Sequence, residues 1–244
     1  MIASGKIGNV KISDCTIPSL LEAVRLHTRK LNGSPFRINC LNAHLFNMCA
    51  DDAELRRLIN DSDIVAADGM SIVWAARLFG IRMESRCNMT EAFRAYMLSA
   101  DMPPVNVVLL GGSADVAAAV AEVINAQCEH CHVTGTYSGY LEDVAYERLL
   151  REQADIDLVL LGMGSPKSER IGALAAQVCR HAVIWHIGGG TLTFMAGVLP
   201  EAPRWMRRCG LQWLHRLLRE PRRLWRRYLL GNPRFLWLLW QSRP

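Results

Sequence analysis

The stretch LVLLGMGSPK, residues 158–167, shows the pattern on which the fold prediction rests. Four consecutive apolar residues lead straight into a turn rich in glycine, and a helical pattern follows from Glu169 to Val178. An apolar run without alternation is typical of a parallel strand that is buried on both faces. The stretch therefore predicts a strand, a tight turn and a helix that packs back onto the sheet.

The same pattern recurs along most of the chain. Apolar runs alternate with longer helical patterns, which predicts an α/β, doubly wound, mostly parallel sheet of Rossmann-like type. We expect helices at Ile17–Leu31, Met70–Phe79, Ala114–Gln127, Asp143–Glu152 and Glu169–Val178. We expect strands at Lys6–Ile12, Phe36–Leu41, Ile64–Ala67, Val105–Leu110, His132–Gly135, Leu158–Leu161 and Val183–Ile187.

The charge is distributed unevenly over the 244 residues. The net charge is +5, yet residues 203–244 hold eleven arginines and one acid, Glu220, so this stretch carries +10 and the remainder −5. A basic segment on a mildly acidic body indicates a polyanionic partner. We expect an α/β domain over residues 1–200 and a basic amphipathic appendage over residues 201–244.

The appendage also holds five of the seven tryptophans, together with leucines at helical spacing. Such a helix lies in the plane of a membrane interface, where arginines attract anionic lipid and tryptophans reach headgroup depth. Nucleic acid is the alternative partner, but leucine and tryptophan fit a headgroup boundary better than a groove. An ordinary amphipathic helix packed on the body is a further alternative. The expected docking residues are Arg204, Trp205, Arg207, Arg208, Trp213, Arg216, Arg222, Arg223, Trp225 and Arg226.

Eight cysteines lie mostly in apolar runs, and the first residues lack the basic and apolar regions of a signal peptide. We therefore expect free thiols and a cytoplasmic protein that contacts the membrane only peripherally, since no stretch approaches the ~20 apolar residues of a span. The run Cys128-Glu129-His130-Cys131-His132 has a haem-attachment spacing and resembles half of a zinc site. Without a second ligand pair, it is interpreted as a helix-to-strand connection.

Four predicted strands end in a turn of glycine or small polar residues that opens a helix. In open α/β sheets the ligand binds beyond the carboxyl ends of the strands, where helix N-termini offer N–H groups to phosphate. Glycine in one such turn is common, but four turns on one edge predict a nucleotide or another phosphate-bearing ligand. The turns are Asp68-Gly69, Gly111-Gly112-Ser113, Gly162-Met163-Gly164-Ser165 and Gly188-Gly189-Gly190-Thr191.

We interpret the turn after residue 161 as a phosphate or ribose loop and not as a hydride-transfer cofactor site, because it lacks the third glycine of a dinucleotide fingerprint. Pro166 suits the first turn of the helix that follows. Two paired-carboxylate motifs, Asp61-Ser62-Asp63 and Asp155-Ile156-Asp157, precede their strands and so belong to the opposite edge. We expect neither a cofactor nor a metal at the ligand edge.

Three residues at that edge are candidates for chemistry. Asp68 directly follows the strand Ile64–Ala67 and can act as a general base on a hydroxyl, or it can cap the next helix. Arg86 lies in a loop, where its guanidinium can neutralise a diphosphate or remain a solvated surface group. Asn42 follows the strand Phe36–Leu41 and either orients a sugar or catalytic partner or caps a helix. His44 and His186, in or beside apolar runs, are expected to be satisfied core or site-lining residues.

Over about residues 37–235 the chain resembles the WecG/TagA/CpsF family of bacterial glycosyltransferases. The order and spacing of several short motifs carry the resemblance. They are Asn42-Ala43-His44, Ala67-Asp68-Gly69, the Arg86 region, Gly112, Ser138-Gly139-Tyr140, Gly164-Ser165-Pro166-Lys167, Gly189-Gly190-Thr191 with Ala196-Gly197, Ala202-Pro203, and Gly210-Leu211 through Trp213, Arg216 and Pro221-Arg222.

The resemblance implies an inverting, metal-independent transfer of a hexose or N-acetylhexosamine-type sugar from a UDP-sugar to a polyprenyl-diphosphate-linked sugar. It places this reaction at the inner face of the cell membrane, in cell-surface or exopolysaccharide synthesis. Asp68 would be the catalytic base, Asn42 a pocket residue near it, and Arg86 the group that stabilises the leaving diphosphate. The donor nucleotide would contact Gly69, Gly111, Gly112, Tyr140, Gly164, Pro166, Glu169, Gly189 and Gly190.

The chain departs from the family's usual residues at six positions near these motifs, so the donor and acceptor sugars stay open. A non-catalytic nucleotide- or lipid-binding protein of the same fold is the alternative function. The departures are Met89, Glu91, Ser168, Thr193, Glu201 and Gln212.

Overall fold

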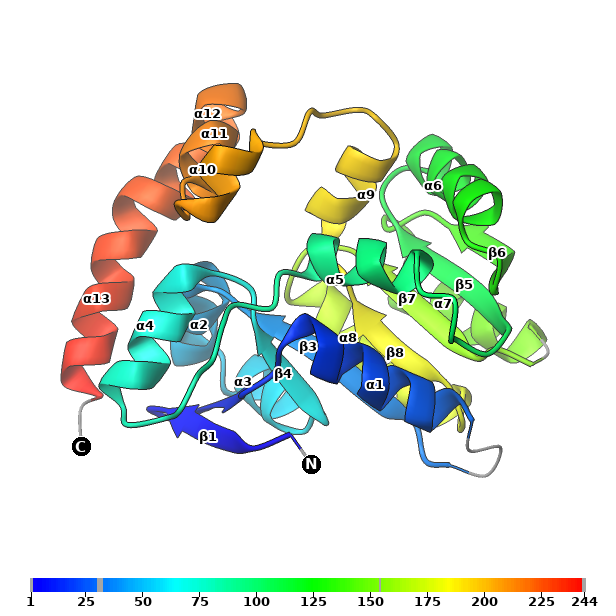
Figure 1. Cartoon of the computed structure of the whole chain (residues 1–244), viewed down its shortest axis with the longest axis horizontal. Helices are drawn as coiled ribbons and strands as arrows, with labels where there is room; N and C mark the ends of the chain where they lie inside the picture. The colour runs from blue at the N-terminus through cyan, green and yellow to red at the C-terminus, as the bar shows by residue number, and fades with distance from the viewer. Residues whose placement is uncertain (1, 30–32, 154, 243–244) are drawn as a thin grey trace.

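The computed structural model describes residues 2–29, 33–153 and 155–242, and the side chains of Arg204 and Arg208 lie outside this description. Its centre is a six-stranded sheet in the order β4-β3-β8-β7-β5-β6, with every pair parallel (Figure 1). The predicted α/β parallel fold is therefore confirmed. The strands are β3 (Phe36–Leu41), β4 (Ile64–Ala67), β5 (Val105–Gly111), β6 (Cys131–Tyr137), β7 (Leu158–Gly162) and β8 (Val183–His186).

Helices cover both faces of this sheet. One face packs against α1 (Ile17–Thr28), α5 (Met89–Met97) and α6 (Ala114–Gln127). The other face packs against two groups of helices, each with its own cluster of buried apolar side chains. These are α2 (Ala43–Asp51), α3 (Ala53–Asn60) and α4 (Met70–Leu78) at one end, and α7 (Asp143–Glu152) and α8 (Lys167–Val178) at the other.

The strands are apolar along their whole length because successive side chains enter different cores. In β5, Val107 and Leu109 belong to the cluster under α1, α5 and α6, whereas Val108 and Leu110 belong to the cluster under α7 and α8. All four side chains are fully buried. This arrangement explains why the apolar runs marked the parallel strands correctly.

The first strand prediction was wrong. Instead of one strand over Lys6–Ile12, the chain forms a two-stranded antiparallel hairpin of β1 (Ser4–Ile7) and β2 (Val10–Ser13). Gly8 lies between them with a φ of 55°, a left-handed conformation that glycine adopts without steric cost. The predicted single strand missed the turn because Gly8 and Asn9 are only two residues between the apolar positions 7, 10 and 12.

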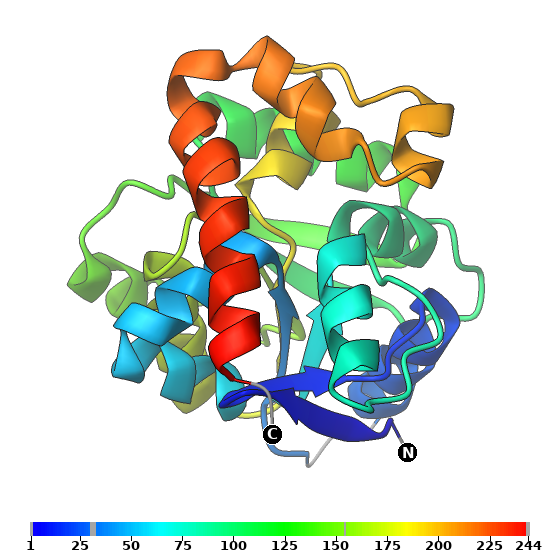
Figure 2. The same cartoon turned by 90° about the vertical axis from the view of Figure 1, so that its left-hand side faces the viewer.

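The C-terminal part is helical and packs on the body. Helix α9 (Gly189–Met195) is followed by α10 (Arg204–Arg208), α11 (Gln212–Arg219), α12 (Pro221–Trp225), a π-helical turn (Arg226–Leu230) and α13 (Gly231–Gln241). Figure 2 shows α13 running down beside the body toward the β1–β2 hairpin. Phe235 and Leu239 of α13 are buried in the cluster that also holds Leu45 and Phe46 of α2.

Among the described residues, no helix combines the length and apolar character needed to cross a bilayer. The eight cysteines are all free thiols, as expected. The division of the chain at residue 200 stays a prediction.

Candidate active site

A cavity of about 1750 Å³ lies at the carboxyl edge of the sheet, between the turns after the strands and helices α11 to α13. Most of the predicted site residues meet there. Gly111 and Pro166 are not part of the lining, and neither are Trp205, Arg207, Arg222 and Trp225 among the described docking residues. Those that line it are Asn42, Asp68, Gly69, Arg86, Gly112, Tyr140, Gly164, Glu169, Gly189, Gly190, Trp213, Arg216, Arg223 and Arg226.

Asn42 and Asp68 are neighbours at this edge. Leu41 of β3 and Ala67 of β4 are paired in register, and the Asp68 backbone N–H donates to the Leu41 carbonyl over 3.0 Å. Asn42 and Asp68 each directly follow one of these paired residues, so they lie side by side at the same end of the two adjacent strands. Asn42 is also the N-cap of α2, because its Oδ1 accepts a 3.0 Å hydrogen bond from the Leu45 N–H. A role of Asn42 in chemistry stays a prediction.

Asp68 does not cap the helix that follows it. The N-cap of α4 is Gly69, which makes no side-chain cap bond. The carboxylate of Asp68 is turned instead to the start of α5, where its Oδ1 accepts hydrogen bonds from the Asn88 Nδ2 at 3.0 Å and the Met89 N–H at 3.1 Å. The capping alternative for α4 is thus wrong, and a different helix N-terminus holds the carboxylate in place.

Burial raises the pKa of Asp68 to about 6. The Met89 N–H and the charges of Arg227, Arg86 and Arg216 oppose this rise, since each favours the ionised carboxylate. A base with a pKa near neutrality combines a deprotonated ground state with good proton affinity. Asp68 therefore has the protonation behaviour that a general base needs.

The other titratable groups of the cavity suit that task less well. Burial lowers the pKa of His44 to about 4 and that of His186 to about 3, so both are weak bases. His186 Nδ1 also lies 3.1 Å from the Ser168 hydroxyl. Glu169 binds Ser165 Oγ through Oε1 over 2.7 Å, while its Oε2 is enclosed and meets no partner in the described chain. Asp68 is therefore better matched to the role of a general base than either histidine.

Arg86 is paired with Glu91, a residue of α5. Its Nη2 donates to both carboxylate oxygens, at 2.9 and 3.1 Å. Glu91 also faces Arg207 of α10 at 3.6 Å, and Arg207 lies 3.2 Å from Glu201. Glu201 in turn pairs with Arg94 at 2.7 Å. Two of the departures from the family pattern, Glu91 and Glu201, thus join the loop of Arg86 to the start of the C-terminal helices.

Two arginines of the C-terminal segment are turned to the cavity. Arg216 of α11 lies against the glycine turn after β8, with its Nη1 and Nη2 3.4 Å from where a side chain on Gly190 would begin. Arg227 lies in the π-helical turn, and burial lowers its pKa. The Nε of each is buried without a hydrogen-bond partner in the described chain. Unpaired guanidinium donors at the carboxyl edge of the sheet form a site for an anion.

Sequence reasoning missed Arg227 and assigned Arg216 to membrane docking. Both belong to a run of arginines in which composition alone cannot separate an inward from an outward side chain. The available signal was helical spacing for Arg227 alone, since residues 223 and 227 are four apart, whereas Arg216 lies before the helix break at Glu220. Arg223 also lines the cavity, although its Nη2 pairs with Glu220 at 2.6 Å.

The glycine turns bring backbone close to the cavity. Gly112 follows β5 with a φ of 68°, a conformation that side chains rarely adopt. At Gly111 an added Cβ would lie 2.5 Å from the carbonyl carbon of Gly162, so the ends of β5 and β7 approach more closely than any side chain permits. Around Gly164 the space is open. These turns leave room for a ligand against exposed backbone N–H groups.

The other predicted docking residues lie on or near the outer surface. Trp205 is 62% exposed and Trp225 41% exposed, and Arg222 is exposed. Arg226 lies over the Trp225 ring, 5.3 Å from its centroid. Arg207 is an exception, because its ion pairs with Glu91 and Glu201 leave its side chain only 18% exposed. The side chains of Arg204 and Arg208 lie outside the described residues.

The two acidic motifs at the opposite edge have structural roles there. Asp63 Oδ2 accepts from the Arg37 N–H, and Asp157 Oδ2 accepts from the Asn106 N–H, each over 2.8 Å. Each carboxylate thus extends the pairing of neighbouring strands by one hydrogen bond.

The fold and this edge can be compared with known proteins. A family model described as "Glycosyl transferase WecG/TagA/CpsF family" matches residues 5–244, nearly the whole chain. The match includes the two strands that place Asn42 and Asp68, the loop of Arg86 and the helices that carry Arg216 and Arg227. The chain therefore belongs to the WecG/TagA/CpsF family of glycosyl transferases, which act in cell-surface polymer biosynthesis.

Proposed function

We propose that this glycosyl transferase moves a hexose or N-acetylhexosamine-type sugar from a UDP-sugar to a polyprenyl-diphosphate-linked sugar, with inversion and without a metal ion. The observation that carries the proposal is the position of Asp68. A carboxylate with a pKa of about 6 lies at the carboxyl edge of the sheet, within the electrostatic influence of Arg86, Arg216 and Arg227. During transfer to a hydroxyl, positive charge develops on the attacking oxygen and negative charge on the leaving group. A base can take the proton from the first, and a cluster of cations can stabilise the second.

The reaction is a single displacement at the anomeric carbon. Asp68 takes the proton of the acceptor hydroxyl as its oxygen forms a bond to that carbon. The bond from the same carbon to the UDP oxygen breaks, and its electron pair remains on the diphosphate. Attack opposite to the leaving group inverts the anomeric configuration.

The guanidinium groups supply the positive charge that the leaving diphosphate requires. Arg216 and Arg227 each bring a buried Nε without a partner, and a phosphate oxygen would satisfy both. Arg86 would exchange its bond to Glu91 for a second set of phosphate contacts. Because Arg216 and Arg227 carry these donors before the substrate binds, they stabilise the transition state with little reorganisation. This charge supports catalysis without a divalent cation.

The exposed apolar side chains of the C-terminal helices support the membrane surface as the place of the reaction. Trp205, Trp237 and Trp240 are 62%, 53% and 67% exposed, and Leu236 is 65% exposed. Arginines from the same helices add attraction to anionic lipid. The acceptor's polyprenyl chain would then stay in the bilayer while its sugar enters the cavity beside Asp68.

The test is transfer by Asp68→Asn, measured with a panel of UDP-sugars and a polyprenyl-diphosphate-linked acceptor. The matched control is Asp115→Asn, an exposed aspartate in the first turn of α6 that does not line the cavity. We expect Asp68→Asn to lose about 10²-fold or more of kcat, as removal of a general base does, while UDP still binds. Activity near that of the control would exclude Asp68 as the base. UDP binding without turnover by the unaltered protein, over the whole panel, would favour a non-catalytic binding protein.

A further inference from the structure

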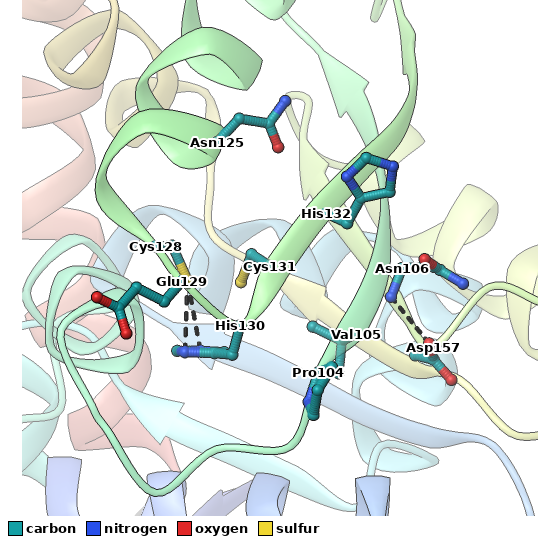
Figure 3. Close-up of a pocket in the computed structure, with 10 residues that line it drawn as sticks. All are labelled: Pro104, Val105, Asn106, Asn125, Cys128, Glu129, His130, Cys131, His132 and Asp157. Carbon is teal, nitrogen blue, oxygen red and sulfur yellow. Dashed lines mark hydrogen bonds between the residues drawn. The ribbon is translucent and has the colours of Figure 1, made fainter.

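A second group of reactive side chains lies at the amino edge of the sheet, away from the cavity beside Asp68. Cys128, His130 and Cys131 each offer one ligand atom, and these atoms all lie within 4.8 Å of one another. The Sγ of Cys128 is 3.4 Å from Nε2 of His130. Figure 3 shows the two thiols and the imidazole turned toward one another in the bend between α6 and β6.

Regular structure fixes this bend at both ends. Cys128 is the C-cap of α6, where its backbone N–H donates to the Ile124 carbonyl. Cys131 is the first residue of β6 and pairs with Val105 of β5. The Cys-x-x-Cys spacing is that of a zinc half-site, and the sequence alone suggested no partner for it. The fold brings the histidine between the cysteines into the same group, which provides three ligands from one short bend.

The surroundings of the group are buried yet polar. Cys128 and Cys131 are 3% and 6% exposed, and neither is oxidised to a disulfide. Tyr96 of α5 is fully buried, and its hydroxyl lies against the Cys131 thiol. Its ring lies edge-on to His130, with 4.9 Å between the ring centroids, so Tyr96 borders the group on two sides. A buried hydroxyl beside two thiols and an imidazole makes these surroundings more polar than an ordinary apolar core.

The dimensions suit a tetrahedral ion. Bonds of about 2.3 Å to sulfur and about 2.0 Å to nitrogen place neighbouring ligand atoms about 3.5–3.8 Å apart. The 3.4 Å between Cys128 and His130 is already close to that value. A cavity of about 590 Å³ adjoins the group and leaves room for water as the fourth ligand. Glu129 and Asp157 line this cavity and add negative charge around a cation.

We propose that Cys128, His130 and Cys131 bind one zinc ion, with water in the fourth position. Two thiols lose their protons as the two Zn–S bonds form, and His130 binds as the neutral imidazole. Two protons are therefore released for each ion bound, and the two thiolates balance the charge of Zn²⁺. The ion ties the end of α6 to β6, the edge strand of the sheet. This site is separate from the transfer chemistry, so either proposal can fail without the other.

The test uses the full chain, kept reduced, stripped with a chelator and titrated with Zn²⁺ against a chromogenic competitor. We expect one ion per chain and an affinity that falls as the pH is lowered. Co²⁺ in place of Zn²⁺ should give a thiolate-to-metal charge-transfer band and the strong visible bands of tetrahedral coordination. Zn²⁺ should raise the Tm of the unaltered chain.

The variants Cys128→Ser, Cys131→Ser and His130→Ala should each weaken Zn²⁺ binding by about tenfold or more. His130 is only partly buried, so His130→Ala tests the site even if a cysteine variant folds poorly. The matched controls are Cys209→Ser, which removes the exposed thiol, and His132→Ala, which removes the exposed imidazole one residue beyond the group. Zinc affinity unchanged in His130→Ala, or a charge-transfer band that survives loss of both Cys128 and Cys131, would overturn the proposal.

Discussion

The side-chain amide of Asn88 donates a 3.0 Å hydrogen bond to the carboxylate of Asp68. Asn88 is also the N-cap of α5, since its Oδ1 accepts from the Glu91 N–H over 3.1 Å. One residue therefore both starts a helix and holds the proposed base. A donor bonded to an ionised carboxylate favours the ionised form, so the Asn88 amide acts on Asp68 in the same direction as the Met89 N–H.

The first prediction concerns pH. Because Asp68 must be deprotonated to accept a proton, kcat/KM of the unaltered enzyme should fall as the pH drops through about 6. In Asn88→Ser the hydroxyl can still cap α5 but is too short to reach Asp68. The acid limb should then move up by roughly one pH unit, the equivalent of one lost charge-assisted hydrogen bond. Profiles of kcat/KM from about pH 5 to 8 give the midpoint of the acid limb for the unaltered enzyme and for Asn88→Ser. An unchanged midpoint in Asn88→Ser would contradict the role of this bond.

The second prediction separates the inward from the outward arginines. Arg227→Ala removes a guanidinium that faces Asp68, and it should lower kcat by about 10²-fold, the usual effect of losing one charge-stabilising donor. Arg222→Ala removes an exposed arginine and should leave kcat unchanged with a short-chain, water-soluble acceptor. It should weaken binding to anionic vesicles by roughly fivefold, the equivalent of about 1 kcal/mol. Equal effects of the two variants in both assays would show that the two side chains do not differ in role.

The third prediction concerns the attachment of α13. The ring of Phe235 packs edge-on against that of Phe46 at 5.3 Å, and Phe235 is 3% exposed. Phe235→Ala should therefore lower the free energy of unfolding by about 3–5 kcal/mol, as loss of a buried aromatic side chain does. Leu236→Ala, one residue further and 65% exposed, should change it by about 0.5 kcal/mol or less. Urea denaturation followed by circular dichroism measures both, and equal midpoints would mean that α13 does not belong to the core.

The fourth prediction tests membrane docking without disturbing the core. Trp237 and Trp240 are both exposed on α13, so the double variant Trp237→Ser, Trp240→Ser should keep the Tm of the unaltered chain. It should co-sediment less with anionic vesicles, and transfer to a long-chain polyprenyl acceptor should fall with it. Transfer to a short-chain acceptor in solution serves as the control and should not change. Undiminished vesicle binding would place the docking surface elsewhere.

The sheet was predictable because its signal is local. Successive residues of a strand point to opposite faces, and Val107, Val108, Leu109 and Leu110 are all apolar and buried. Such a run can be recognised in the sequence without knowing which strands lie beside it. The error at the N-terminus arose where this signal is weakest. A short segment with apolar residues on both sides of Gly8 fits a single strand as well as a hairpin, and only the pairing of Ile7 with Val10 decides between them.

The site was predictable only in part because its contacts join distant segments. That Asp68 lies at the ligand edge follows from its place after β4. Its partners Asn88 and Met89 lie beyond the loop that follows α4, and nothing in their spacing shows that the loop returns to β4. The same limit applies to Arg207, which composition assigns to a basic surface and the fold pairs with Glu91 and Glu201. Helical periodicity locates a face but does not say which face meets another element.

The packing of α13 against α2 has a consequence for acceptor length. Phe235 and Leu239 share a core with Phe46, so the exposed tryptophans of α13 are joined to Asp68 by rigid structure and not by a flexible tether. If these tryptophans rest in a bilayer, the fold sets one height of the catalytic base above the lipid surface. Acceptor selectivity would then depend partly on length. An acceptor hydroxyl one sugar from the diphosphate and one several sugars away lie at different distances from the lipid surface, so only one of them can reach Asp68.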